Sequence, residues 1–160
     1  MALDAKATTR AADFLALQRA AIVDAAVSSV AGAHARHYES AGPSEIRARL
    51  EALFDRLVDA AASRDLGCVV AYARRLAGER FSAGYDLSEV QTAINALEEA
   101  VWGRVISELQ PGEFAEALGL VSTTLGAAKD ALAREYVSLA TRAHAPSLDL
   151  RALFAGVEQA

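Results

Sequence analysis

The stretch ERFSAGYDLSEVQTAINALEEAVW, residues 79–102, decides the fold, because it contains the end of one helix and the start of the next. Gly84 stands where a helix ends in a left-handed residue, a position that favours glycine. Asp86 and Glu89 are three residues apart, the spacing of a capping box at a helix start. Apolar residues then return at three- and four-residue steps. The stretch therefore predicts two helices joined by a capped turn.

The same periodicity predicts helices outward from this turn in both directions. Apolar residues recur at helical spacing in the segments 9–36, 44–63, 65–83, 86–109 and 113–143. Ser44 is well placed to cap the second of these segments. Only three prolines interrupt the whole chain. The sequence therefore predicts an all-α bundle of about five main helices, of which the C-terminal one is long.

The chain length fits one domain of ordinary size, because it has 160 residues. Hydrophobic residues make up 53% and charged residues 23%, so the chain can fold around a core of its own. Pro146 interrupts the last helix, and Ser147 behind it could cap a further short one. We expect a helical domain over residues 1–145. The tail at 146–160 is expected either to dock on it or to begin a linker.

The charge balance argues against nucleic acid as a partner. Lysine and arginine number 16 against 21 acidic residues, the net charge is −5, and no basic stripe is present. A polybasic segment for a membrane surface is missing too. The N-terminus does not resemble a secretory signal, and no run of 18 uncharged apolar residues predicts a membrane span. With one cysteine, Cys68, the sequence favours a cytoplasmic protein.

Candidate metal-binding and nucleophilic residues are few. His34 and His37 are three residues apart and could hold a metal from one helix face, but no third ligand stands nearby and His144 is distant. Such a pair more often consists of two solvated residues in a last helical turn. Cys68 lies early in a helix, where a thiol can become reactive. Its apolar neighbours favour a small buried residue instead. The sequence therefore predicts no metal site.

A charged group precedes the turn and has two interpretations. Its members are Arg74, Arg75, Glu79 and Arg80. They could bind an anion or position a substrate. More ordinarily, they form a solvated helix face on which Arg75 pairs with Glu79, four residues later.

Signs of catalysis are weak elsewhere. Asp86 and Glu89 could act as an acid–base pair, but helix capping explains their spacing fully. The sequence contains no phosphate-binding loop, no dinucleotide fingerprint and no nucleophile elbow. We therefore expect a protein that is not an enzyme and that has no cofactor.

The last predicted helix carries a leucine at every seventh position from Leu118 to Leu139. The paired heptad position begins at Phe114 and turns polar toward the C-terminal end. Gly119 and Gly126 are also seven residues apart, and each costs about 1 kcal/mol relative to alanine, which a close helix crossing would explain. We therefore expect a homodimer. Its tentative interface consists of Leu118, Val121, Leu125, Ala128, Leu132 and Leu139.

Residues 72–102 resemble the N-terminal domain of RsbR-type stressosome proteins, the RsbT co-antagonists. The shared pattern is an arginine-rich helix ending in Ala-x-Glu-Arg, a turn with glycine, a Leu-x-Glu-Val helix start and an aromatic residue near the next helix end. These positions are Ala77, Glu79, Arg80, Gly84, Leu87, Glu89, Val90 and Trp102. In helix order, the resemblance covers residues 14–143.

The resemblance implies a globin-like helical fold without haem, used as a sensory or scaffolding domain and typically dimeric. The residues are consistent with the absence of haem. Positions 65–84, where the resemblance places the proximal haem ligand, contain no histidine. Family members often continue into a STAS domain that is phosphorylated. This chain is expected either to stand alone or to be part of a longer protein, and no phosphorylation site is carried over to it.

Three functions of different classes stay open. The first is a non-enzymatic regulatory sensor or scaffold of bacterial stress signalling, which acts through dimerisation and binding of a signalling protein. The second is a binding module for a small apolar, lipid-like ligand in the cavity that a globin uses for haem. Phe81, Tyr85, Ile94 and Trp102 would line that cavity. The third and weakest is an enzyme that uses a metal at the histidine pair.

Overall fold

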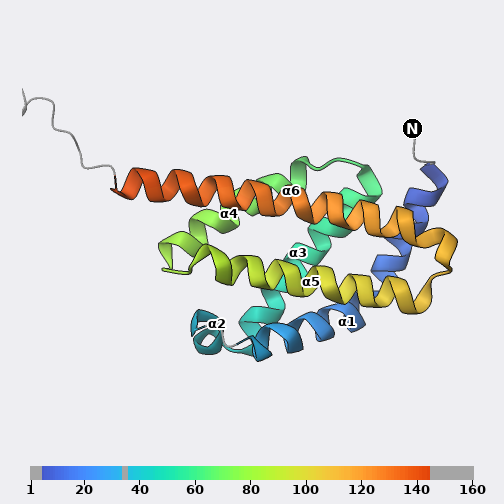
Figure 1. The fold of residues 1–160 in the computed structure, drawn as a ribbon, viewed down its shortest axis with the longest axis horizontal. Coiled ribbons are helices and arrows are strands. Elements are labelled where there is room, and N and C mark those ends of the chain that lie inside the picture. Colours follow the sequence, from blue (N-terminus) through green and yellow to red (C-terminus); the bar gives the residue numbers. More distant parts are fainter. Residues whose placement is uncertain (1–4, 34–35, 145–160) are drawn as a thin grey trace, which may run out of the picture.

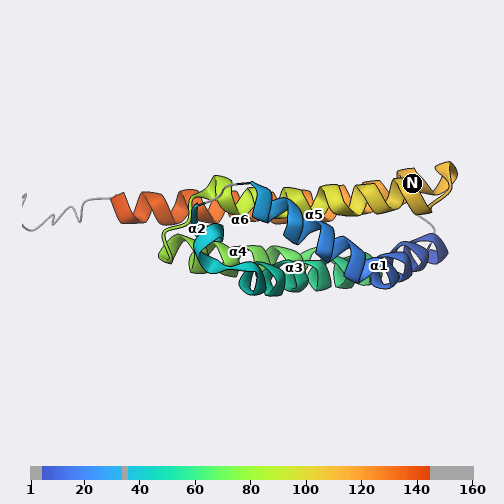
Figure 2. The ribbon, with the colours of Figure 1, turned by 90° about the horizontal axis from the view of Figure 1, so that it is seen from below.

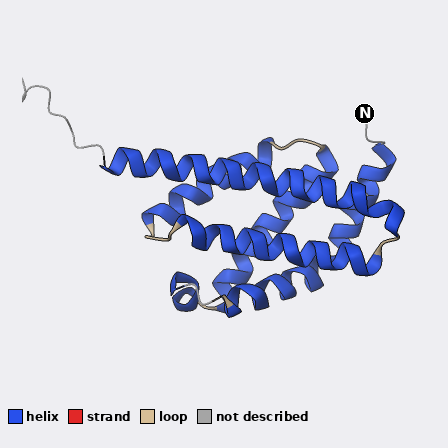
Figure 3. Ribbon diagram, viewed as in Figure 1, coloured by secondary structure: helices blue, strands red, loops and turns tan. Residues whose placement is uncertain are grey.

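The computed structural model describes residues 5–33 and 36–144, which are helical almost throughout (Figure 1, Figure 3). In chain order the helices are α1 (Ala5–Gly32), α2 (Arg36–Ala41), α3 (Pro43–Ser63), α4 (Gly67–Ser82), α5 (Leu87–Glu108) and α6 (Pro111–His144). The described residues contain no strand. The prediction of an all-α bundle with five main helices and a long C-terminal one is confirmed. The short α2 was not predicted.

The helices form two layers (Figure 2). α5 and α6 run antiparallel in one layer, α3 and α4 lie in the other, and α1 crosses from the second layer toward α5. Accordingly, α6 packs mainly on α4 and α5, while α1 packs on α3 and α5. With 34 residues, α6 is about 51 Å long at 1.5 Å per residue. It therefore contacts both layers along most of the bundle.

One hydrophobic core joins all six helices. Each helix contributes at least one buried side chain, in chain order Ile22, Tyr38, Phe54, Val69, Leu97 and Leu125. Burial of one large apolar side chain stabilises the fold by about 1.5–3 kcal/mol. The described residues therefore pack as one unit. The expected domain limits at 1 and 145 stay a prediction, and the tail at 146–160 lies outside the described residues.

Among the helix boundaries that differ from the prediction, glycine and proline define two. α3 begins at Pro43 with Gly42 as its N-cap, so Ser44 lies inside the first turn and does not cap it. Proline suits that position because its missing N–H would have no partner there. Gly42 has a φ of +82°, which only glycine adopts without strain. α1 likewise ends at Gly32, four residues earlier than expected.

One segment of α1, Arg10–Gly32, is long and apolar enough to cross a membrane by length and composition. The sequence was expected to contain no such segment. Ile22 and Val23 from the same segment have no exposed surface, because they belong to the core. A core helix passes the same test of length and composition, so the segment is weak evidence for a membrane span.

Candidate functional site around the α4–α5 turn

The α4–α5 turn has the geometry that its sequence predicts. α4 ends at Ser82, and Gly84 follows with a φ of +82°. At the start of α5 both halves of the capping box are formed. Asp86 donates its backbone N–H to Oε2 of Glu89 at 3.0 Å. Both carboxylates therefore serve the helix start, as the capping interpretation predicts.

Arg80 is the residue whose position the sequence did not reveal. We expected it on a charged helix face, yet only 5% of it is exposed. Its guanidinium carbon lies 4.5 Å from the centre of the Tyr85 ring, and its Nη1 lies 3.8 Å from Oε1 of Glu45. Charged side chains are seldom buried unless they are paired. Arg80 therefore links α4 to α3 and to the turn.

The other members of the charged group lie on the surface. Arg74 is exposed, and Nε of Arg75 lies 3.7 Å from Oε1 of Glu79, as the i, i+4 spacing predicts. Arg75 also lies over the ring of Tyr72, with 5.4 Å from its guanidinium carbon to the ring centre. Exposed ion pairs of this kind contribute little to stability. The predicted group of four is thus divided, because Arg80 alone enters the interior.

Glu45, in the first turn of α3, is shared by two arginines. Arg49 donates from Nε to Oε1 of Glu45 at 3.1 Å, and its Nη2 contacts the same oxygen. The same Oε1 also faces Nη1 of Arg80. One carboxylate oxygen therefore faces two guanidinium groups where α3, α4 and the turn meet.

Two aromatic pairs surround this meeting point. The ring centres of Tyr38 and Tyr85 are 5.4 Å apart and those of Phe81 and Tyr136 are 5.8 Å apart, both edge to face. The hydroxyl of Tyr136 also donates to the backbone carbonyl of Tyr85 at 3.2 Å. Aromatic pairs add about 0.5–1.5 kcal/mol beyond the area they bury. Together they attach α2 and α6 to the turn.

Burial keeps these tyrosines neutral. It is the main cause that raises the pKa of Tyr136 to about 12, with Asp86 and Glu89 acting in the same direction. Burial also raises the pKa of Tyr38 well above its usual range. Because a buried phenolate would lose its hydration, the protonated form is favoured. At neutral pH both hydroxyls are hydrogen-bond donors, and neither is activated as a base.

The four residues predicted to line a ligand cavity do not surround a common space. Ile94 lines a cavity of about 20 Å³ between α3, α4 and α5, enough for one water molecule. Phe81 and Tyr85 take part in the aromatic pairs, and Trp102 is 42% exposed. Drug-sized ligands occupy pockets of roughly 300 Å³ or more. The geometry of these four residues therefore gives the ligand hypothesis no support.

Four of the six residues assigned to the dimer interface lie in the core of this chain. The exposed fraction is at most 1% for each of Val121, Leu125, Ala128 and Leu132. Leu118 and Leu139 are half-buried. Because these four side chains already pack inside the bundle, they are not available to a second chain in this arrangement. The interface assignment as a whole stays a prediction.

Gly119 and Gly126 do not mark a close crossing within the described chain. A methyl group added at either position would meet nothing within 4 Å. Gly119 is exposed and Gly126 is half-buried. The expectation of a close crossing is therefore wrong for contacts inside this chain.

The remaining candidates are Cys68 and the histidine pair. Cys68 is half-buried, and its Sγ lies 3.7 Å from the backbone oxygen of Asp65. His34 lies outside the described residues, as do the side chains of His37 and His144. Within the described part of the chain, no group of three or more His, Cys, Asp or Glu residues could hold a metal ion. The alternative of a metal at the histidine pair is therefore untested.

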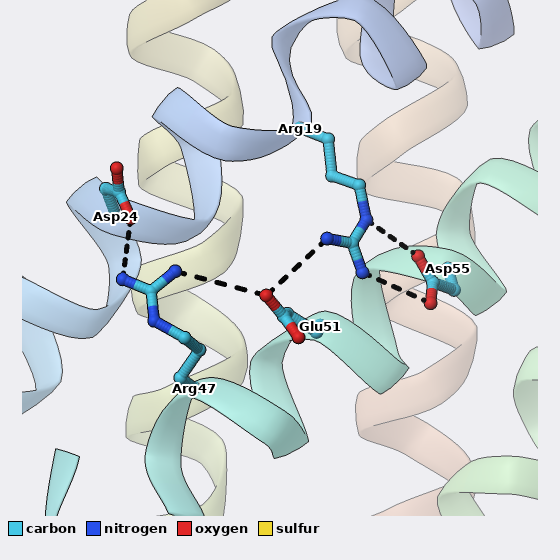
Figure 4. A network of polar contacts seen from close by, with 5 residues as sticks. All are labelled: Arg19, Asp24, Arg47, Glu51 and Asp55. Carbon is cyan, nitrogen blue, oxygen red and sulfur yellow. Dashed lines mark hydrogen bonds and ion pairs between the residues drawn. The ribbon is translucent and has the colours of Figure 1, made fainter. Parts of the chain in front are cut away.

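A second polar cluster, which the sequence did not predict, lies between α1 and α3 (Figure 4). Arg19 donates from Nε to Oδ1 of Asp55 at 3.1 Å, and its Nη1 lies 3.5 Å from Oε1 of Glu51. Arg47 donates to Oδ1 of Asp24 at 2.6 Å and lies 3.9 Å from the same Glu51 oxygen. The hydrogen bond to Asp55 raises the pKa of Arg19. The contacts of Arg19 and Asp24 join α1 to α3, so no local spacing reveals them, whereas Arg47 and Glu51 are four residues apart within α3.

Comparison with known proteins agrees with the pattern at this turn. Residues 16–152 match the family described as "RsbT co-antagonist protein rsbRD N-terminal domain". The match spans well over half of the chain and includes the α4–α5 turn, so the resemblance seen in the sequence is confirmed. No curated protein and no solved structure matches the chain. The chain belongs to the RsbT co-antagonist rsbRD N-terminal domain family, a family of stress-signalling regulatory domains.

Proposed function

We propose that this chain is a non-enzymatic, cytoplasmic module of bacterial stress signalling that works by self-association and by binding a signalling protein. The family match over residues 16–152 carries the proposal. The polar groups around the α4–α5 turn support it, because capping, ion pairing and packing account for their positions. A module of this kind produces its output through the surfaces that it presents to other proteins.

The outer side of the α5–α6 layer is the surface that we assign to self-association. On α5, Trp102 and Ile106 are 42% and 58% exposed and stand one turn apart. On α6, Gly119, Gly126 and Val137 follow one another at steps of 7 and 11 residues. These steps are close to two and three helical turns, so the three residues share one face. We call these five residues the outer face.

The two halves of the outer face adjoin each other. Lys129 on α6 lies 3.3 Å from Oδ1 of Asn95 and 2.6 Å from Oε2 of Glu98 on α5. Gly126 precedes Lys129 by one turn, and Trp102 follows Asn95 by about two turns. Because α5 and α6 run antiparallel, both residues lie on the same side of this contact. In the described part of the chain, no other helix covers this side of the layer (Figure 2).

The composition of the outer face suits a contact between proteins. Tryptophan is enriched at interfaces, because it buries a large area and keeps few rotatable bonds. The two glycines have no side chain, so a second helix can approach the α6 backbone closely. Val137 is 63% exposed and extends the apolar surface along α6. A close approach by a second chain would offset the helix-weakening effect of the glycines.

Native mass spectrometry and light scattering test this proposal. We expect a dimer for the unchanged chain, and Trp102→Glu with Ile106→Glu should weaken it about 100-fold or more, because two interface anchors are lost. Circular dichroism should stay unchanged, since both side chains are exposed. The matched control is Leu17→Glu on α1, which is 82% exposed and should leave the dimer intact. A dimer that survives the double substitution would rule out this surface.

The same spectrum separates the second function that the sequence leaves open. A small apolar ligand that stays bound would add a reproducible mass to the chain. Its presence would turn the proposal toward a ligand-binding module. A bare mass together with a dimer supports the regulatory scaffold.

A further inference from the structure

Arg49 and Arg80 place two positive charges against one carboxylate oxygen. Arg49 donates to Oε1 of Glu45 at 3.1 Å, and Nη1 of Arg80 lies 3.8 Å from the same atom. The side chain of Arg80 is only 6% exposed, so water screens its charge poorly. The arginine pair is therefore only half neutralised by the carboxylate between them.

The hydrogen-bond donors of Arg80 are not fully used by this arrangement. Its Nε is buried and has no hydrogen-bond partner. A separation of 3.8 Å between Nη1 and Glu45 is too long for a hydrogen bond. A guanidinium presents a fork of donors that matches both oxygens of a carboxylate. Glu45 satisfies Arg49 and leaves this fork of Arg80 unfilled.

Two tyrosines share a small cavity with Arg49. Tyr38 and Tyr72 line the cavity of about 20 Å³ together with Arg49. The positive charge of Arg49 acts on both, lowering each pKa against the larger effect of burial. On Tyr72 this effect exceeds the opposing one of Glu79, whereas on Tyr38 the opposing effect of Tyr85 is larger than that of Arg49. The charge of Arg49 therefore acts on both tyrosines of the cavity wall.

Glu45 is able to leave this position. Its side chain is 43% exposed, so it can rotate into water. It lies in the first turn of α3, where the helix dipole favours a negative charge in either orientation. Exposed carboxylates of this kind contribute little through their ion pairs. A ligand carboxylate therefore has to displace only the weakly held side chain of Glu45.

We propose that Arg49 and Arg80 form a binding site for a small carboxylate ligand, which Glu45 fills in this structure and vacates when the ligand binds. The ligand carboxylate lies between Nη1 of Arg80 and the guanidinium of Arg49, where the carboxylate of Glu45 lies in this structure. The site lies where α3, α4 and the α4–α5 turn meet, away from the outer face. It exists whether or not the chain self-associates, so its test is independent of the proposed function.

The first test is rescue of Glu45→Ala by sodium acetate. The substitution removes the internal carboxylate and leaves space beside both arginines, so the melting temperature should fall. Acetate should restore most of that loss in a concentration-dependent way, because it binds the folded state alone. Sodium chloride at equal ionic strength is the control for general screening. Equal effects of acetate and chloride would overturn the proposal.

Two further variants check that rescue arises at this site. Adding Arg80→Gln to Glu45→Ala should abolish the acetate response, since the fork is gone. Glu108→Ala is the matched control, because Glu108 also pairs with an arginine four residues away and is 45% exposed. It should show no specific response to acetate. A response of equal size in Glu108→Ala would contradict a built site.

The resonance of the Arg80 Nε–H in a ¹⁵N–¹H spectrum keeps the proposal testable if Glu45→Ala does not fold. In Glu45→Gln, which keeps the side-chain volume, this resonance should shift with acetate until it saturates. In the unchanged protein the same shift should need a higher acetate concentration, because Glu45 competes. No saturable shift in Glu45→Gln would overturn the site. A shift in Glu45→Gln alone would overturn displacement of Glu45.

Discussion

Single residues hold the α4–α5 turn through contacts that cross the bundle. The hydroxyl of Tyr136 on α6 reaches the backbone carbonyl of Tyr85 across 51 positions of sequence. Tyr136 is 6% exposed and Tyr85 is 9% exposed, so water competes poorly for either group. Buried carbonyls that lose their donors carry a full desolvation penalty. The turn is therefore sensitive to changes of one atom.

Tyr136→Phe removes that one oxygen and keeps the ring packed against Phe81. We expect the free energy of unfolding to fall by about 1–2 kcal/mol, because the Tyr85 carbonyl loses its partner. Urea denaturation followed by circular dichroism measures this change. Tyr72→Phe is the control, since Tyr72 contacts Arg75 through its ring. Equal losses in the two variants would show that the hydroxyl of Tyr136 has no special role.

Alkaline pH should weaken the fold through the same side chain. The pKa of Tyr136 is raised from 10.0 to about 12 in the folded chain. Between these values the unfolded state binds fewer protons than the folded state, so the free energy of unfolding falls as pH rises. Urea midpoints on either side of pH 10 measure the fall. Tyr136→Phe should show a shallower decline, and an unchanged slope would contradict the assignment.

The sequence predicted those residues whose partners are close along the chain. The capping box at Asp86 and Glu89 is visible from a spacing of three, and Gly84 follows from helix-end chemistry. The burial of Arg80 was not predictable in this way. Its carboxylate partner, Glu45, belongs to another helix, and only folding brings the two together.

At the scale of elements, α6 shows what a heptad does and does not predict. The leucine repeat indicates a helix with a continuous buried stripe, and that part is confirmed by Leu125 and Leu132. It does not indicate which element covers the stripe. α4 and α5 lie along α6 and fill it from within the same chain. Periodicity is a property of one helix, whereas its partner depends on the whole fold.

Replacing glycine by alanine should change the free energy of unfolding in opposite directions inside a helix and beside one. Gly119→Ala should raise the stability of the single chain by about 0.5–1 kcal/mol, because alanine favours helix and the added methyl meets nothing within 4 Å. Gly84→Ala should lower it by about 1 kcal/mol, because φ is +82° there. Urea denaturation at low protein concentration measures both.

The same Gly119→Ala chain also reports on self-association. If a second helix approaches the outer face closely, the added methyl should weaken the dimer while the single chain gains stability. Light scattering over a dilution series separates the two effects. A dimer of unchanged affinity would show that the contact does not reach Gly119.

At the scale of the whole molecule, the sequence predicted the class of fold and not the arrangement. Alanine-rich periodic segments with few prolines are enough to predict an all-α chain. The two-layer arrangement depends on contacts between distant segments, such as those of α1 with α3 and α5. The cluster of Arg19 with Glu51 and Asp55 likewise depends on a contact between distant segments. The candidate surfaces could therefore be placed only after the helices were.

α6 is also a lever. Near its start, Glu113 lies 3.7 Å from Arg10 of α1, and farther along Tyr136 is fixed to the α4–α5 turn. A stiff rod of about 51 Å that tilts by about 5° moves its tip by about 4 Å. Tyr136 lies most of the way along this rod, so a tilt about the start of α6 would move it by about 3 Å and would break its hydrogen bond to the α4–α5 turn.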